Sequence, residues 1–101
     1  MTEMKRREIR EIDAYDPSKG VTFEWSGDAW ARIVATGGEV VLRANRPGLT
    51  ALADCLLALA DPEVPVGSHL HLDDFSFLTR DSLSIVLELA AELTDENGRP
   101  A

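Results

Sequence analysis

The stretch that decides the fold runs from Asn45 to Ala60 and reads NRPGLTALADCLLALA. Asn45 suits a helix N-cap because its side-chain oxygen can accept a bond from a free backbone N–H, and Pro47 follows where a missing N–H costs little. The apolar residues then recur with the helical period and fall within one arc: Leu49, Leu52, Ala53, Leu56, Leu57, Leu59 and Ala60. This pattern predicts a helix that covers one face of a sheet with its leucine-rich arc.

Three β-prone runs precede this helix. Residues 21–26 read VTFEWS and alternate apolar with polar side chains, as in a strand with one buried face. Residues 30–35 and 39–44 flank the short loop of Thr36, Gly37 and Gly38, which suits a tight antiparallel hairpin. The three runs together predict three consecutive strands.

Two more strands are predicted after the helix. Residues 68–74 read SHLHLDD and alternate strictly, so we expect a strand there. Residues 75–81 are interpreted as a loop that tucks one of its two phenylalanines under the helix. Residues 83–89 fit both a strand and a helix; we favour a strand, with residues 90–93 frayed or helical.

These elements predict an α+β fold, namely a two-layer sandwich with one main helix on one face of a mostly antiparallel sheet of about five strands. The expected order is β-β-β-α-β-β. A length of 101 residues suits one domain. We expect residues 21–93 to form this domain, residues 1–20 to be a basic N-terminal arm and turn that need not be firmly ordered, and residues 94–101 to be a polar tail.

The charge is strongly acidic and unevenly distributed. The formal net charge is −8, with +2 on residues 1–10 and −10 on the remainder. An acidic body repels phosphate backbones and anionic lipids, so we expect neither nucleic-acid nor membrane binding. The acidity either serves solubility alone or speeds the encounter with a basic protein. A single cysteine, no leader-like start and no apolar run of about 18 residues predict a cytoplasmic protein.

The sequence does not predict an enzyme or a cofactor. Cys55 lies at the edge of the apolar arc, without the nearby positive charge that a reactive thiolate requires, so we expect it to pack. None of the serines lies in a G-x-S-x-G turn. The pair Gly37-Gly38 lacks the surrounding pattern of a phosphate loop and suits a hairpin.

His69 and His71 are the only histidines, and their spacing on a strand places both rings on one face, with Asp73 next in line. Metal binding by these three residues is one hypothesis, although zinc would need a further ligand, such as Glu88 from the last strand. The simplest alternative is a solvated face of the sheet. A third interpretation, which we adopt as a prediction, is a partner-binding patch that also includes Asp74.

Arg46 is the remaining predicted partner contact. It lies in the junction Asn45-Arg46-Pro47-Gly48, where free backbone donors at a helix N-terminus favour anions, and Arg43 or Arg46 could add a charged bond. The alternative is that Asn45 simply caps the helix and Gly48 permits close packing.

The sequence also resembles a known family. The stretches VLRANRPGLTALAD (Val41–Asp54) and VGSHLHLDD (Val66–Asp74), followed by a serine-containing apolar strand at residues 82–89, resemble the immunity protein 32 family of small bacterial proteins assigned to polymorphic toxin systems. The resemblance covers residues 39–89. The chain departs from the family pattern at Phe75–Leu78, which is more apolar than usual.

This resemblance implies a non-catalytic protein that binds and neutralises a cognate toxin, by occluding its surface in our interpretation. The acidic body is consistent with a basic toxin domain as partner. Two alternatives stay open. One is a structural or regulatory module that forms a homodimer through an exposed strand, and the other is a metal- or small-molecule-binding domain centred on His69 and His71.

Overall fold

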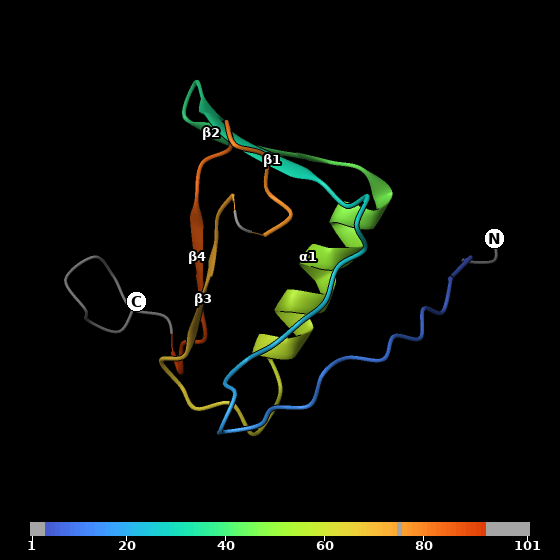
Figure 1. Ribbon diagram of the computed structural model, residues 1–101, viewed down its shortest axis with the longest axis vertical. Helices are drawn as coiled ribbons and strands as arrows, with labels where there is room; N and C mark the ends of the chain where they lie inside the picture. Colours follow the sequence, from blue (N-terminus) through green and yellow to red (C-terminus); the bar gives the residue numbers. More distant parts are fainter. Residues whose placement is uncertain (1–3, 75, 93–101) are drawn as a thin grey trace.

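The fold combines two β-hairpins with one helix, as seen in a computed structural model that describes residues 4–74 and 76–92. The elements are β1 (Ala31–Thr36), β2 (Glu39–Ala44), α1 (Arg46–Leu59), β3 (His69–Leu72) and β4 (Ile85–Glu88). The β1–β2 hairpin lies across the top of Figure 1, β3 and β4 descend on the left, and α1 descends on the right. The predicted α+β class is confirmed.

The β1–β2 hairpin forms where the sequence predicts it. Its antiparallel register runs from Ala31 opposite Ala44 to Thr36 opposite Glu39. Gly37 and Gly38 make the turn with φ values of 56° and 79°, a left-handed conformation that side chains with a Cβ disfavour. The glycine pair is therefore turn chemistry, as expected.

The helix also begins where predicted, with Asn45 as its N-cap. The Asn45 Oδ1 atom accepts hydrogen bonds from the N–H groups of Gly48 at 2.8 Å and Trp30 at 3.1 Å. The Asn45 amide donates to the carbonyl oxygen of Asp28 at 2.8 Å. One side chain thus joins the start of α1 to the chain that enters β1.

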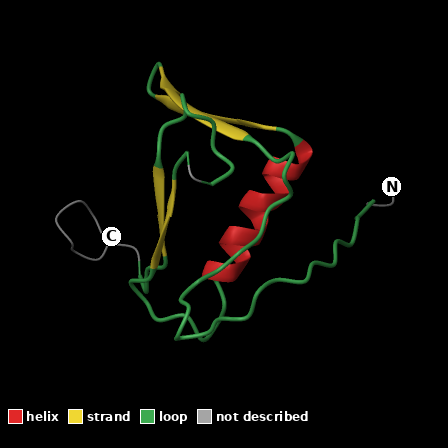
Figure 2. Ribbon diagram, viewed as in Figure 1, coloured by secondary structure: helices red, strands yellow, loops and turns green. Residues whose placement is uncertain are grey.

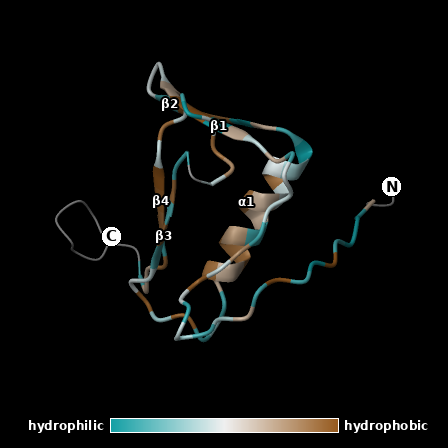
Figure 3. Cartoon of the chain, viewed as in Figure 1, coloured by the Kyte–Doolittle hydropathy of each residue, from teal (hydrophilic) through white to brown (hydrophobic). Residues whose placement is uncertain are grey.

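The predicted leucine-rich contact face of α1 is only partly correct: Leu59 is buried and Leu52 packs against the core, but most of the arc lies outside the buried face. The buried helix residues are Gly48, Ala51, Cys55, Ala58 and Leu59. By contrast, Leu49, Leu56 and Leu57 are 50%, 46% and 49% exposed. The buried face is turned from the leucine arc by roughly a third of a turn at 100° per residue. Apolar residues cover much of the second half of α1 (Figure 3), so periodicity alone does not select the inner face.

Small residues select that face because α1 packs closely on its neighbours. The core combines residues from several elements: Ala31, Ile33, Ala51, Cys55, Leu72, Phe77 and Leu78. A Cβ atom added to Gly48 would clash with the backbone carbonyl of Trp30. Small side chains at Ala51, Cys55 and Ala58 let the helix pack closely on the core, whereas leucines at these three positions would hold it away.

The predicted strand at residues 21–26 is absent, and the five-stranded sheet is replaced by two separate antiparallel pairs, β1–β2 and β3–β4. Residues 4–30 contain no helix or strand (Figure 2). The free edge of β1 is occupied by residues 77–83 instead. Ala31 donates to the Phe77 carbonyl at 3.0 Å, and Leu83 donates to the Ile33 carbonyl at 2.8 Å. A strand from residues 21–26 therefore has no place on this edge.

Aromatic contacts fix residues 21–26 without a strand. The ring centroids of Phe23 and Trp25 lie 5.5 Å apart, and each ring also lies near Phe77, at 6.3 and 6.1 Å. Phe77 is buried in the core, so the prediction that this loop tucks a phenylalanine inward is confirmed for Phe77. Phe75 lies outside the described residues.

The second hairpin pairs His69 with Glu88 at one end and Leu72 with Ile85 at the other. The strand interpretation of the last segment is confirmed for Ile85–Glu88. Residues 90–92 are not helical, and residue 93 lies outside the described residues. Leu72 is buried in the core, which anchors the apolar face of β3 and leaves the histidine face outside.

Candidate partner-binding site

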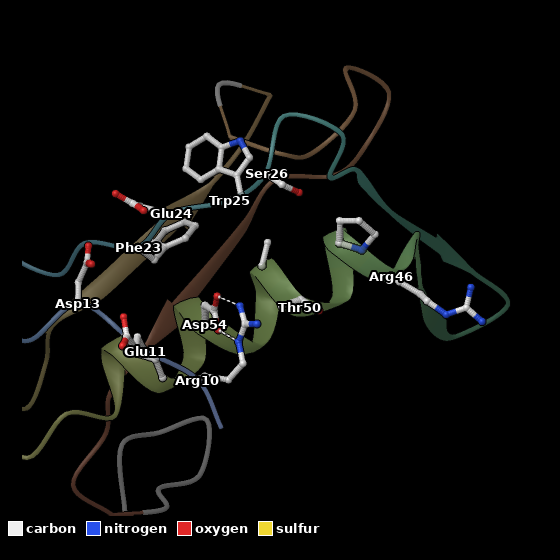
Figure 4. A pocket seen from close by; sticks show the side chains of 13 residues that line it. Arg10, Glu11, Asp13, Phe23, Glu24, Trp25, Ser26, Arg46, Thr50 and Asp54 are labelled. Atoms are coloured by element: carbon white, nitrogen blue, oxygen red, sulfur yellow. Dashed lines mark hydrogen bonds and ion pairs between the residues drawn. The ribbon is translucent and has the colours of Figure 1, made fainter. Parts of the chain in front are cut away.

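An open cleft of about 660 Å³ lies along the first half of α1. Its walls are residues 10–13 of the N-terminal arm, residues 23–26 and the helix itself (Figure 4). These segments are distant in sequence and meet only in the folded chain. It is larger than two other hollows on the surface, which have volumes of about 410 and 310 Å³.

The cleft combines an apolar lining with an acidic rim. Phe23, Trp25 and Pro47 contribute apolar surface, and Trp25 is 42% exposed. Glu11, Asp13 and Glu24 supply carboxylates from the arm and from the aromatic segment. All three residues are exposed, and none of them forms an ion pair with another described residue. An aromatic face beside carboxylates is an arrangement that accepts a lysine or arginine side chain, with its stem on the ring and its charge at the rim.

A two-bond ion pair ties the arm to the helix at this cleft. Arg10 donates to Asp54 through Nε at 3.1 Å and through a terminal guanidinium nitrogen at 2.7 Å. These hydrogen bonds and the charge of Asp54 raise the pKa of the Arg10 guanidinium. The pair fixes one wall of the cleft and neutralises its own two charges, so the carboxylates on the rim dominate the remaining field.

The predicted contact residues do not form one site. Arg46, the first residue of α1, lines the cleft, whereas His69 and His71 lie on β3 at the other side of the molecule (Figure 1). Asp73 and Asp74 directly follow β3, the first half-buried and the second exposed. Arg46 therefore belongs to a different surface from the other four predicted residues.

The two histidines share one exposed face, as their spacing predicts. Their ring centroids lie 5.0 Å apart at an interplanar angle of 77°. His69 lies opposite Glu88, and His71 lies opposite Val86, which is 56% exposed. The described part of the chain contains no group of three or more histidine, cysteine, aspartate or glutamate residues that could hold a metal ion.

Cys55 is packed rather than presented to solvent. Its side chain is fully buried, and its Sγ atom donates to the carbonyl oxygen of Ala51 at 3.2 Å. Burial raises the pKa of the thiol to about 11, which keeps it protonated at neutral pH. A nucleophilic cysteine needs a lowered pKa, nearby positive charge and access to solvent.

The comparison with known families gives one decisive result. The family model of immunity protein 32, Imm32, matches residues 39–90. The chain belongs to the immunity protein 32 family. The resemblance read from the sequence is thereby confirmed. No curated protein and no solved structure matches the chain.

The Imm32 match covers the whole histidine face but only part of the cleft. It includes β2, α1, β3 and β4, and hence the whole histidine face. In the cleft it includes only the helix wall, because the arm and residues 23–26 precede it.

Members of an immunity family are typically non-catalytic, which agrees with the buried thiol. No helix among the described residues of this Imm32 member has the length and apolar character needed to cross a membrane.

The sequence did not predict most of the cleft in this Imm32 member. Glu11 and Asp13 lie in a segment with no clear helical or strand pattern, and Glu24 lies in the run that was wrongly predicted as a strand. One signal was present, since Asp54 is the single acidic residue of α1 and the arm carries several basic residues. That pairing identifies the arm as a neighbour of the helix, but not the acidic rim that results.

Proposed function

We propose that this chain is an immunity protein that binds a cognate bacterial toxin and neutralises it by covering the toxin's surface. Membership of the immunity protein 32 family carries this proposal. The net charge of −8 supports a basic toxin domain as the partner, because opposite fields speed encounter and disfavour wrong partners. Occlusion suits a small chain whose single thiol is buried.

The cleft is the contact surface that we favour. Its exposed Trp25 provides apolar area of the kind that dominates binding energy in protein interfaces. Glu11 and Glu24 surround that ring with charge that complements a basic side chain of the toxin. Arg46 at the helix end of the cleft would orient the partner by repelling its basic groups from that end.

The histidine face is the second candidate contact surface, as the sequence predicted. His69, His71, Asp73 and Asp74 lie on or directly after β3, and Val86 adds an exposed apolar side chain beside them. Imidazole rings can bury and hydrogen-bond at interfaces, so this face is suited to a protein partner.

Co-expression with the toxin encoded beside the gene tests the function. Cells that produce both proteins should survive, and the purified pair should bind with an association rate that falls steeply with salt. The double variant Glu11→Lys/Glu24→Lys should lower that rate by about tenfold or more at low salt. The matched control Glu63→Lys/Glu92→Lys makes the same change of net charge at two exposed residues outside the cleft lining and should have a smaller effect.

The two contact surfaces give different results in this assay. If the double variant His69→Ala/His71→Ala abolishes rescue while the cleft variants do not, the toxin docks on the histidine face. If the chain neither rescues cells nor binds that toxin, the proposed function is wrong.

A further inference from the structure

The outer edge of β2 has backbone groups that point away from its hairpin. Directly opposite residues of an antiparallel pair either bond each other or both point outward. Ala31 and Ile33 on β1 point outward, since their backbone groups bond residues 77–83. Leu42, opposite Ile33, and Val40, two residues further along, must therefore point outward from β2. Among the described residues, no backbone hydrogen bond reaches Val40 or Leu42 from outside the hairpin.

The side chains along this edge are apolar and exposed. Val40 is 70% exposed and Leu42 is 37% exposed. They lie on the same face of the hairpin as Ala31 and Ile33, which are buried in the core. The hairpin thus extends its apolar face beyond the core. An exposed apolar edge strand without proline or lysine is the usual template for adding another strand.

The sequence of this edge complements itself when one copy is reversed. Residues 39–43 read EVVLR, with an acid at one end, a base at the other and Val41 at the centre. If two copies lie antiparallel about Val41, each Glu39 is opposite an Arg43 and each Val40 is opposite a Leu42. Opposite charges and paired apolar side chains are the contacts that stabilise neighbouring strands.

Backbone geometry and charge select the same register. Val40 and Leu42 both point outward, so a Val40–Leu42 pair can exchange both of its backbone hydrogen bonds, about four bonds for the two pairs of a dimer. Symmetric pairing about Val40 or about Leu42 is also possible for the backbone. Those registers, however, place Glu39 or Arg43 opposite a valine, and the charges find no partner.

We propose that two copies of this chain associate through β2, antiparallel and centred on Val41, so that their hairpins form one four-stranded sheet. The interface lies on the β1–β2 hairpin, whereas the cleft is formed by the arm, residues 23–26 and α1. The proposed dimer contact therefore uses no residue of the cleft, and it can be tested with the purified chain alone.

Sedimentation velocity of the full chain, from low micromolar to several hundred micromolar, tests this proposal. The wild-type chain should shift from monomer to dimer as concentration rises. Arg43→Glu or Glu39→Arg alone places like charges opposite each other and should raise the dissociation constant by tenfold or more. The double variant Glu39→Arg/Arg43→Glu restores opposite charges across the interface and should recover most of the wild-type affinity.

Thermal unfolding of each variant serves as the folding control, because Glu39 and Arg43 are both exposed and should tolerate the changes. Val40→Lys, a charge on the exposed edge, should also abolish the dimer. A wild-type chain that remains monomeric throughout the concentration range would overturn the proposal. A dimer that is insensitive to the single charge reversals, or that the double variant does not restore, would also overturn it.

Discussion

Gly48 is the residue that allows α1 to approach the chain entering β1. A Cβ atom at this position would clash with the Trp30 carbonyl group, which is backbone and cannot rotate away. Helix propensity alone predicts that Gly48→Ala stabilises α1 by up to about 1 kcal/mol. We expect instead a loss of about 3 kcal/mol, since overpacking forces the backbone apart.

Chemical denaturation measures this loss, and Gly27→Ala is its matched control. A Cβ atom at Gly27 meets nothing within 4 Å, and its φ is not positive. The control should change the free energy of unfolding by less than about 0.5 kcal/mol. Equal stability of the two variants would mean that the helix is not held against Trp30.

Cys55 should make the folded chain sensitive to alkaline pH. Burial raises the pKa of its thiol from the ordinary 9.0 to about 11. The folded chain therefore keeps a proton that the unfolded chain releases. The resulting stabilisation is complete below pH 9 and is lost as the pH rises from 9 through 11.

Unfolding by denaturant at a series of pH values tests this dependence, with Cys55→Ala as the reference. The variant should be less stable at neutral pH because it leaves a cavity, but its stability should fall less between pH 9 and pH 11. If the stability of the two proteins falls equally with pH, the pKa of Cys55 is not raised in the folded chain.

Among the elements, the hairpin and the helix ends were predictable and the inner face of the helix was not. Asn45 and the pair Gly37-Gly38 act through local backbone geometry, so residue type alone locates them. The face of α1 depends on how closely β1 and Phe77 approach it. That distance is a tertiary property, and it favours Ala51 and its small neighbours over the longer leucines.

Because small residues line most of the buried face of α1, enlarging one of them should destabilise the chain more than replacing an exposed leucine with a polar residue. Ala51 is buried, so Ala51→Leu should lower the free energy of unfolding by about 2 kcal/mol through overpacking. Leu57 is half-exposed, so Leu57→Gln should change it by less than about 1 kcal/mol. Denaturant titration of both variants measures the contrast. A larger loss from Leu57→Gln would show that the leucine arc is the packed face after all.

At the scale of the whole molecule, the cleft depends on chain segments that no local pattern joins. Trp25 reaches the core through Phe23 and Phe77 rather than through a strand. The histidine face could be predicted because a single strand determines it. The cleft could not, since its walls come from an arm, an irregular segment and a helix, each placed by contacts distant in sequence. Arg10 and Asp54 are the most specific of these contacts.

The Arg10–Asp54 pair should therefore control how firmly the arm lies on α1. Asp54→Asn keeps the size of the side chain but removes its charge, and it should speed tryptic cleavage after Arg10 several-fold. Asp81→Asn is the control, because it removes the Arg32–Asp81 pair, at 3.0 Å, elsewhere in the fold. The control should leave cleavage at Arg10 unchanged. Equal cleavage rates in both variants would mean that contacts other than the Arg10–Asp54 pair hold the arm on α1. The position of the acidic wall of the cleft would then not depend on this pair.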